Sequence, residues 1–429
     1  MKYQAINPKL FIDNRKRFAA MLKPGGIAVF NSNDLLPTNA DGHMLFRQNN
    51  DLFYLSGIDQ EESILVLFPH AHDPAHREVL FLKETSDEIA IWEGAKHSKK
   101  SAYEASGIKT VYWLQHFEKV FKQLVCEADS IYLNTNEHLR AVIETETRDT
   151  RFIQWIKTNY PLHSLERVAP IMHQLRSVKS GLEIELMQTA IDITEKGFRR
   201  VLEFVKPGVM EYEIEAEFIH EFVRNRSRGF SYTPIIASGF NACVLHYIDN
   251  NQECKAGDVI LLDVGAEYAN YAADMTRCIP VSGRFTDRQK AVYNAVHRVM
   301  KEAMKMLRPG TMLADYHKEV GKVMESELLG LGLLSKTDIA NQNPEWPAYK
   351  KYFMHGTSHF LGLDVHDVGL WHKPIQPGMV FTVEPGIYIR EESLGIRLEN
   401  NIMVTESSPR DLMANIPLEA DEIESLMNR

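Results

Sequence analysis

Apolar residues recur at helical spacing in some segments and at strand spacing in others, and the first 165 residues mix the two. Residues 8–22 form an amphipathic pattern that predicts a helix. Short apolar runs bounded by turn residues predict strands, namely GIAVF, ESILVLF, EVLFL and SIYLN. Helical stretches such as 137–156 alternate with these runs, so we expect a mixed α/β domain with helices packed on a sheet.

The segment NYPLHSLERVAP, at residues 159–170, interrupts both patterns with two prolines. Prolines so placed are typical of a connection rather than of a helix or strand interior. The sequence therefore predicts a domain boundary near residue 165, with an N-terminal domain at 1–165 and a second domain at 166–429.

Two long helices are predicted in the second domain. Ser180 and Glu183 form a capping box that opens the first, and Thr286 and Gln289 do the same for the second. Each helix ends at a basic-Pro-Gly sequence, at 206–208 and at 308–310.

The sequences around these helices repeat. VKPGVM (205–210) aligns with LRPGTM (307–312), and GDVILLDVG (257–265) aligns with GMVFTVEPG (378–386). Both segments of the second pair carry an acid six residues after their first glycine. This acid is Asp263 in 257–265 and Glu384 in 378–386. This pattern indicates an internal duplication with pseudo-two-fold symmetry, in which equivalent residues meet at a central cleft.

Two pairs of acids flank the predicted strands of this duplication. Asp263 and Asp274 follow one another across a hairpin whose midpoint is Tyr268–Ala269, which predicts that they lie opposite each other. Glu384 and Glu399 are related in the same way.

A divalent cation would relieve the repulsion between carboxylates so placed. The segment HGTSHFLGLDVH between the hairpins supplies histidines, and one of them, His359, completes a plausible set of four carboxylates and an imidazole. Four negative charges balance two divalent cations. Oxygen-rich ligation favours manganese, with zinc, cobalt and iron as alternatives. Arg397 points to the same side of its strand as Glu399.

Composition excludes several classes of function. The 429-residue chain has a formal net charge of −10, which disfavours nucleic-acid binding. It has no apolar N-terminal segment typical of secretion and no apolar run of the ~18 residues that a membrane helix needs. Its four cysteines lack disulfide or metal spacing, so we expect a cytoplasmic protein.

Four segments resemble the M24 metallopeptidases of the pita-bread fold: LLDVGAEYANYAADMTR, HGTSHFLGLDVHDVG, TVEPGIY and GIRLENNIMVT. RQNNDLFYLSG (47–57) and IWEG (91–94) resemble the N-terminal domain of the Xaa-Pro aminopeptidases within that family.

The resemblance implies site residues by position. The implied ligands of a dinuclear centre, typically of manganese, are Asp263, Asp274, His359, Glu384 and Glu399. The implied substrate-site histidines are His246, His355 and His366, and Tyr232 and Arg397 are implied to support the ligands. The N-terminal domain is implied to cap the cleft and to support a homodimer or homotetramer.

The resulting functional expectation is an aminopeptidase that hydrolyses the Xaa-Pro bond at peptide N-termini by attack of a metal-bridging hydroxide, with Glu384 as the proton acceptor. Prolidase, which cleaves Xaa-Pro dipeptides, is the alternative. A non-catalytic binding scaffold on the same fold is a more distant one. Two weaker hypotheses concern the N-terminal domain, in which Asp51 faces the substrate amine and Trp92 reaches a neighbouring subunit. The cluster of His70, His72 and His76 is interpreted as a solvated turn.

Overall fold

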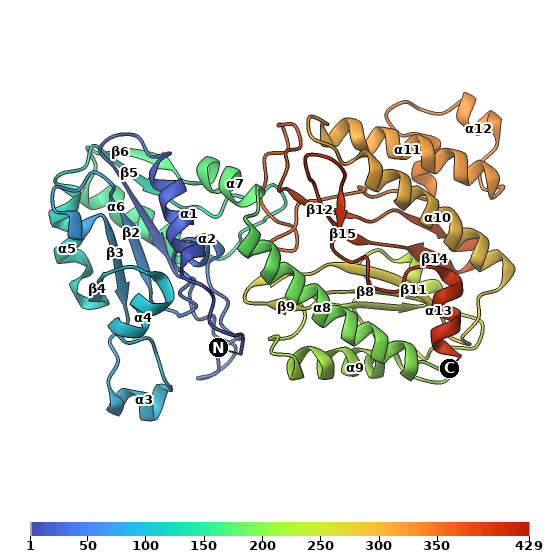
Figure 1. The fold of residues 1–429 in the computed structure, drawn as a ribbon, viewed down its shortest axis with the longest axis horizontal. Coiled ribbons are helices and arrows are strands. Elements are labelled where there is room, and N and C mark those ends of the chain that lie inside the picture. The colour runs from blue at the N-terminus through green and yellow to red at the C-terminus, as the bar shows by residue number, and fades with distance from the viewer. Residues whose placement is uncertain (1, 429) are drawn as a thin grey trace. The chain divides into compact units, whose positions relative to one another are not determined.

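The computed structural model describes residues 2–428, and these form two compact units. The N-terminal unit covers Tyr3–Leu175, and the C-terminal unit begins at Arg176. Figure 1 follows the chain through both of them by colour. Each unit buries apolar side chains between its own sheets and helices, as an independent domain does.

A single six-stranded mixed sheet forms the centre of the N-terminal unit, in the order β4-β3-β2-β1-β5-β6. Its strands are β1 (Gly26–Asn31), β2 (Ile64–Leu67), β3 (Glu78–Leu82), β4 (Thr110–Trp113), β5 (Ser130–Leu133) and β6 (Ser164–Arg167). Neighbours among β1, β2 and β3 are antiparallel, whereas β4, β5 and β6 are added in parallel. All four apolar runs predicted as strands are in this sheet.

The helices of this unit are α1 (Lys9–Ala19), α2 (Asn50–Ser56), α3 (Asp87–Glu93), α4 (Lys99–Ser106), α5 (Phe117–Val125), α6 (Arg148–Asn159) and α7 (Ala169–Ser177), with short 3₁₀ turns at Pro74–His76 and Leu114–His116. Helix α5 packs its apolar face, including Phe117 and Phe121, on the sheet residues. The prediction of a helix over 137–156 is wrong in its first half. The helix begins only at Arg148, because Thr147 caps it by accepting a hydrogen bond from the Thr150 amide.

The boundary between the units lies after Leu175 rather than near residue 165. Residue 165 is inside β6, which pairs in parallel with β5. Pro161 lies in the turn before β6 and Pro170 lies in the first turn of α7, so neither proline marks a linker between the units. Proline is tolerated in all of these places, so the sequence signal does not distinguish them.

The C-terminal unit contains two pairs of long helices. Its helices are α8 (Gly181–Phe204), α9 (Glu211–Arg224), α10 (Asp287–Met306), α11 (Leu313–Gly330), α12 (Lys336–Ala340) and α13 (Ala420–Met427), with 3₁₀ turns η3 (Gly239–Cys243), η4 (Ala348–Lys351) and η5 (Arg390–Glu392). Helix α8 packs on α9 and α10 packs on α11. Both predicted capping boxes are present, at the start of α8 and of α10.

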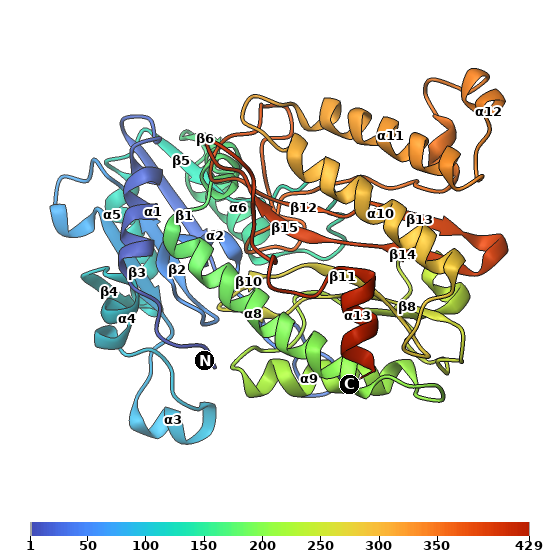
Figure 2. The same ribbon diagram turned by 45° about the vertical axis from the view of Figure 1, so that its right-hand side comes forward.

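Antiparallel strands lie between these helix pairs, as Figures 1 and 2 show. The first half supplies β7 (Ile235–Ser238), β8 (Val259–Val264), β9 (Glu267–Tyr268), β10 (Tyr271–Ala272) and β11 (Met275–Pro280). The second half supplies β12 (Val380–Val383), β13 (Gly386–Ile389), β14 (Leu394–Arg397), β15 (Asn400–Met403) and β16 (Arg410–Asp411). Each half is thus a helix pair followed by antiparallel strands, which is the duplicated pita-bread arrangement.

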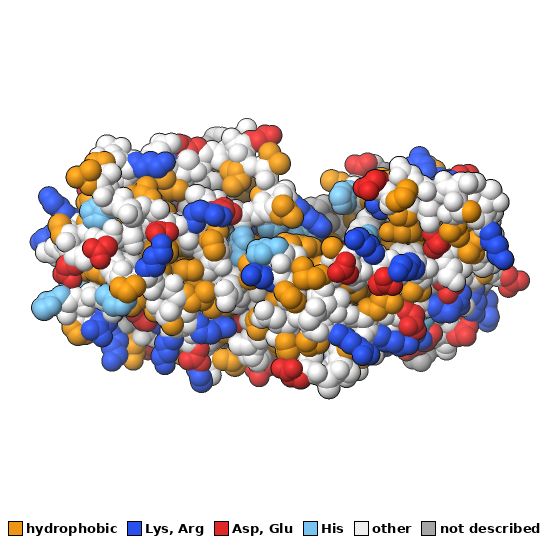
Figure 3. Space-filling view, turned by 90° about the horizontal axis from the view of Figure 1, so that it is seen from above, with side chains coloured by type: hydrophobic (Ala, Val, Ile, Leu, Met, Phe, Trp, Pro, Cys, Tyr) orange, Lys and Arg blue, Asp and Glu red, His pale blue; other side chains and the backbone are white. Residues whose placement is uncertain are grey.

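Figure 3 shows basic and acidic side chains interspersed on the face that it draws. Among residues 2–428, no helix combines the length and the apolarity that crossing a bilayer requires.

Candidate metal centre

The first hairpin brings its two aspartates to the same side of the sheet but not directly opposite each other. Asp263 in β8 pairs with Thr276 in β11, so Asp274 is diagonal to Asp263. Side chains two residues apart on a strand share a face, and the two carboxylates therefore remain neighbours.

The prediction of direct opposition is wrong because of the turn. Tyr268 pairs with Tyr271, and the two residues between them, Ala269 and Asn270, both have positive φ angles of 52° and 67°. A two-residue turn with left-handed backbone matches the twist of a hairpin. It places the midpoint one residue later than the sequence interpretation did.

Tyr232 joins the two aspartates. Its hydroxyl lies 2.6 Å from Oδ1 of Asp263 and 2.6 Å from Oδ1 of Asp274. A phenol has a single proton to donate, so it satisfies only one of the two carboxylates at a time. The remaining negative charge needs another partner.

The second hairpin has the predicted register. Val383 of β12 pairs with Asn400 of β15, and Gly386 of β13 pairs with Arg397 of β14. Both pairings place Glu384 opposite Glu399. The two glutamates therefore face each other across the ladder, as the sequence indicated.

Thr276 and Asn401 connect the two halves at the acids. Thr276 forms an isolated bridge with Glu399, and its hydroxyl donates to Glu399 Oε2 at 2.6 Å. The amide of Asp274 donates to Asn401 Oδ1 at 3.2 Å, and Asn401 Nδ2 donates to the Asp274 carbonyl at 2.6 Å. These contacts hold Asp274 of the first hairpin close to Glu399 of the second.

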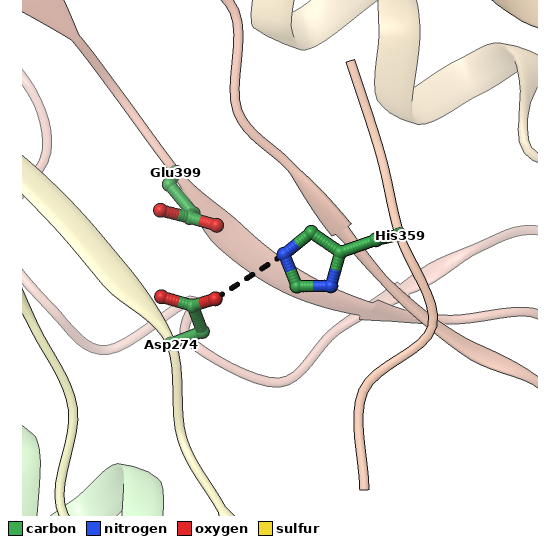
Figure 4. A group of neighbouring side chains, drawn as sticks. All are labelled: Asp274, His359 and Glu399. Atoms are coloured by element: carbon green, nitrogen blue, oxygen red, sulfur yellow. Dashed lines mark ion pairs between the residues drawn. The ribbon is translucent and has the colours of Figure 1, made fainter. Parts of the chain in front are cut away.

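His359 faces Asp274 and Glu399, as Figure 4 shows. Its Nε2 lies 3.4 Å from Asp274 Oδ2 and 3.6 Å from Glu384 Oε1. Its Nδ1 lies 2.9 Å from the carbonyl oxygen of Phe360, which requires a proton on Nδ1. The lone pair of a neutral His359 therefore points at carboxylates, an arrangement that is favourable only with a proton or a cation between them.

Burial makes the acids difficult to ionise together. It raises the pKa of Glu384 to about 7. Burial, followed by the charges of Asp274, Glu384 and Asp263, raises the pKa of Glu399 well above its ordinary value. Burial also raises the pKa of Asp263, although Arg397 opposes the shift. Burial opposes protonation of His359, but Asp274 and Glu384 outweigh it and raise the pKa of that imidazole.

Three observations show that these residues fit a divalent cation. Glu399 Oε1 is buried and has no hydrogen-bond partner among the described residues. One ligand atom from each of Asp274, His359 and Glu399 lies within 4.8 Å of the others. Carboxylate oxygen and imidazole nitrogen are donors that manganese, zinc, cobalt and iron accept. A cation bound there would satisfy the orphaned oxygen and the crowded charges at once.

Arg397 and Tyr388 contact the side chains of the site through hydrogen bonds and an ion pair. Arg397 forms an ion pair with Asp263 Oδ2 and donates to the Tyr388 hydroxyl at 2.9 Å and to Thr276 Oγ1 at 3.2 Å. The Tyr388 hydroxyl also lies 2.8 Å from His355 Nε2. Burial, with the nearby Arg397 charge, lowers the pKa of His355 to about 3, so this imidazole is neutral at physiological pH.

Two further predicted histidines differ in exposure, since His366 is half-buried and His246 is exposed. The His366 ring lies 4.5 Å from the His359 ring, nearly perpendicular to it. His246 is exposed in the segment after η3, and a positive charge on it lowers the pKa of His355.

Sequence reasoning missed Thr276, Asn401, Tyr388 and Thr382. Thr382 accepts a hydrogen bond from the His359 amide at 3.2 Å. Thr276, Thr382 and Asn401 each stand two residues from a predicted ligand on the same strand, and that spacing could have identified them.

The remaining predictions concern the N-terminal unit. His70 and His72 are exposed, whereas His76 is half-buried and lies 3.4 Å from the Tyr112 hydroxyl. Asp51 is buried and accepts a hydrogen bond from Asn134 at 2.9 Å. Trp92 is 90% exposed on α3.

Comparisons with known proteins identify the family of the chain. Residues 185–406 match the family model of metallopeptidase family M24, and residues 11–132 match that of the aminopeptidase P N-terminal domain. The chain is 33% identical to an Xaa-Pro aminopeptidase of Escherichia coli (strain K12), over 98% of each chain.

Solved structures are similar over the same length. Pseudomonas aeruginosa aminopeptidase PepP is 30% identical, with a TM-score of 0.90 over 99% of this chain and 98% of that one. Escherichia coli aminopeptidase P, solved in a zinc-substituted form with product and in another form with the inhibitor Pro-Leu, is 32% identical, with a TM-score of 0.88 over 99% of each chain.

Proposed function

Because the chain belongs to metallopeptidase family M24, we propose that it is an Xaa-Pro aminopeptidase, which hydrolyses the bond before a proline at the second position of a peptide. The observation that carries a hydrolytic function is the group of Asp274, His359 and Glu399, whose ligand atoms lie within 4.8 Å of one another and which includes the orphaned Oε1 of Glu399. Similarity to aminopeptidases P over the whole chain, including the N-terminal domain, supports the choice of substrate.

The proposed site would hold two divalent ions, most simply manganese. The residues that would bind them are Asp263, Asp274, His359, Glu384 and Glu399. Two such cations would lower the pKa of a water molecule and polarise the scissile carbonyl.

The chain's own residues have separate tasks in this proposal. Glu384 accepts a proton from the attacking water and delivers it to the departing proline nitrogen. His366, together with His246, donates hydrogen bonds to the carbonyl oxygen as negative charge develops. His355, neutral and held by Tyr388, forms a wall for the proline ring.

Proline is acceptable at such a site for a simple reason. Its ring fixes the backbone and it has no amide N–H, so a site that requires no hydrogen bond from that position loses nothing by binding it. The proline preference itself is supported by the similarity to aminopeptidases P and not by the geometry of the acids.

The experiment compares two peptides with the manganese-loaded protein. We expect efficient release of arginine from Arg-Pro-Pro and weak cleavage of Gly-Pro. A strong preference for the dipeptide would indicate a prolidase instead. Manganese binding without cleavage of either peptide would indicate a binding scaffold.

Glu384→Gln is the matched control for this assay. The amide keeps the shape of the side chain but cannot take a proton, so we expect kcat to fall by ~10²- to 10⁴-fold. Circular dichroism should show an unchanged fold. A fully active variant would exclude the assigned role of Glu384.

We further propose a homodimer or homotetramer in the cytoplasm. Three of the four cysteines are buried, and all four are free thiols, which suits a reducing compartment. Sedimentation analysis of the intact protein tests the oligomeric state.

A further inference from the structure

Helix α11 contacts the histidine-bearing loop through two adjacent side chains. His317 Nδ1 lies 2.8 Å from Thr357 Oγ1, and the Tyr316 hydroxyl lies 3.0 Å from Ser358 Oγ. Tyr316 and Thr357 are both almost completely buried, at 2% and 1% exposure. These two bonds fasten the residues immediately before His359.

The same loop holds the backbone of Glu384. The Thr357 carbonyl accepts a hydrogen bond from the Glu384 amide at 2.9 Å. Thr357 is therefore attached to α11 by its side chain and to Glu384 by its backbone. A displacement of Thr357 would change the separation between the His359 imidazole and the Glu384 carboxylate.

Aromatic packing reinforces this connection. The Phe353 ring contacts the His317 ring at a centroid distance of 6.0 Å and the His355 ring at 4.9 Å. The segment from Phe353 to Ser358 is thus held along one side of α11.

The first half of the duplication contains an equivalent device, by which we mean a set of hydrogen bonds between the second helix of a half and its histidine-bearing segment. Glu211, the first residue of α9, is fully buried and accepts hydrogen bonds from the Ser238 amide at 2.8 Å, the Tyr247 hydroxyl at 2.7 Å and the Gln252 amide at 2.9 Å. These donors enclose the segment that carries His246. In each half, the N-terminal part of the second helix therefore fixes the histidine-bearing segment of that half.

We propose that Tyr316 and His317 are positioning residues that set the geometry of His359 and Glu384 for metal binding, whereas Glu211 and Tyr247 position His246 for the substrate alone. The role of His246 rests on the proposed function, and the role of Tyr316 and His317 rests on the metal ligands assigned in it. The two devices have different consequences, because His359 and Glu384 belong to the metal centre and His246 does not.

Manganese titration by calorimetry of the metal-stripped protein tests the first device without using activity. The variants are His317→Leu, Thr357→Val, which preserves side-chain shape, and the combination of both. We expect each single variant to bind manganese ~10- to 100-fold more weakly, as loss of a residue that orients a ligand usually does. The double variant should be no worse than the worse single one, because both remove the same bond. His317→Asn, which retains a polar atom near Nδ1, should recover most of the affinity.

Two control variants separate positioning from general destabilisation. Tyr293→Phe removes a buried hydroxyl that donates to the Leu418 carbonyl at 2.7 Å from α10, and it should leave manganese affinity unchanged. Tyr247→Phe should also leave manganese affinity unchanged but lower kcat/KM for Arg-Pro-Pro.

Wild-type manganese affinity in Thr357→Val would overturn the proposal, and so would an equal loss of affinity in Tyr293→Phe. If His317→Leu does not fold, Thr357→Val still decides. If the wild-type protein binds manganese but cleaves neither peptide, the proposed function is wrong. The manganese titrations would still test whether the contact between α11 and Thr357 sets the metal affinity.

Discussion

Glu399 shows at the scale of one residue how this site differs from an ordinary buried ion pair. Its Oε2 accepts a hydrogen bond from Thr276, but its Oε1 is buried and has no hydrogen-bond partner within residues 2–428. Leaving a buried charged oxygen unsatisfied costs more than leaving a neutral one. A protein retains such an atom when a ligand completes it, and the surrounding Asp274 and His359 are suitable co-ligands.

Asp149 is a buried acid outside the site, and it leads to a prediction about pH. Burial raises its pKa from 3.8 to about 7, although Asn31 and Asn136 donate hydrogen bonds to its two oxygens at 2.8 and 2.9 Å. Between pH 3.8 and about pH 7, Asp149 keeps a proton in the folded protein that it releases in the unfolded chain. The contribution of Asp149 to the free energy of unfolding is therefore largest at low pH and is lost as pH rises toward 7.

The Asp149→Asn variant has an amide that does not titrate at this position, so its stability lacks this dependence on pH. The stability of the variant relative to wild type should thus increase from pH 5 to pH 7, by at most about 1.4 kcal/mol per pH unit, and then level off. Urea unfolding at several pH values measures the slope. Glu104→Gln, at an exposed position, is the control and should show no such trend; a flat Asp149→Asn difference would contradict the prediction.

At the scale of elements, the loop from Gly362 to Asp367 is fixed by buried charges. Asp367 forms two ion pairs. Its Oδ1 lies 2.6 Å from the Arg176 guanidinium, and its Oδ2 lies 3.1 Å from Lys179 Nζ. All three side chains are buried. Their cluster attaches the loop that carries His366 to the start of the C-terminal unit.

Gly362→Ala should break this cluster. A Cβ at Gly362 would lie 2.1 Å from Asp367 Oδ2 and 3.0 Å from Lys179 Nζ. Because the carboxylate cannot move without losing its buried contacts with Arg176 and Lys179, we expect a loss of about 3 kcal/mol or more, together with a fall in kcat.

Thermal unfolding and peptide assays measure these effects. Gly330→Ala is a suitable control, because a Cβ there meets no atom within 4 Å. If both glycine variants unfold at the wild-type temperature, the cluster does not hold the loop.

At the scale of the whole molecule, all five proposed ligands belong to the C-terminal unit. A cation that binds only the folded form stabilises it by mass action, by about 2.7 kcal/mol at a concentration 100 times its Kd. Manganese should therefore raise the unfolding temperature of the C-terminal unit, and chelation should lower it. The N-terminal unit should melt at the same temperature in both conditions, as calorimetry would show; equal shifts of both transitions would contradict the placement of the metals.

The sequence by itself determined the features that depend on neighbouring residues. Helix starts at Ser180 and Thr286 follow from capping chemistry within four residues. The pairing of Glu384 with Glu399 follows from a connection whose length permits a regular hairpin. The duplication was visible because each half carries its own copy of the same local pattern.

Only the tertiary structure decided how distant segments meet. Left-handed backbone at Ala269 and Asn270 shifted the first hairpin by one residue at its midpoint, which hydrophobic alternation does not reveal. Thr276 reached Glu399, and His317 reached Thr357, through packing between halves and between a helix and a loop. Such contacts join residues far apart in the chain, and their energies depend on the complete fold rather than on any local spacing.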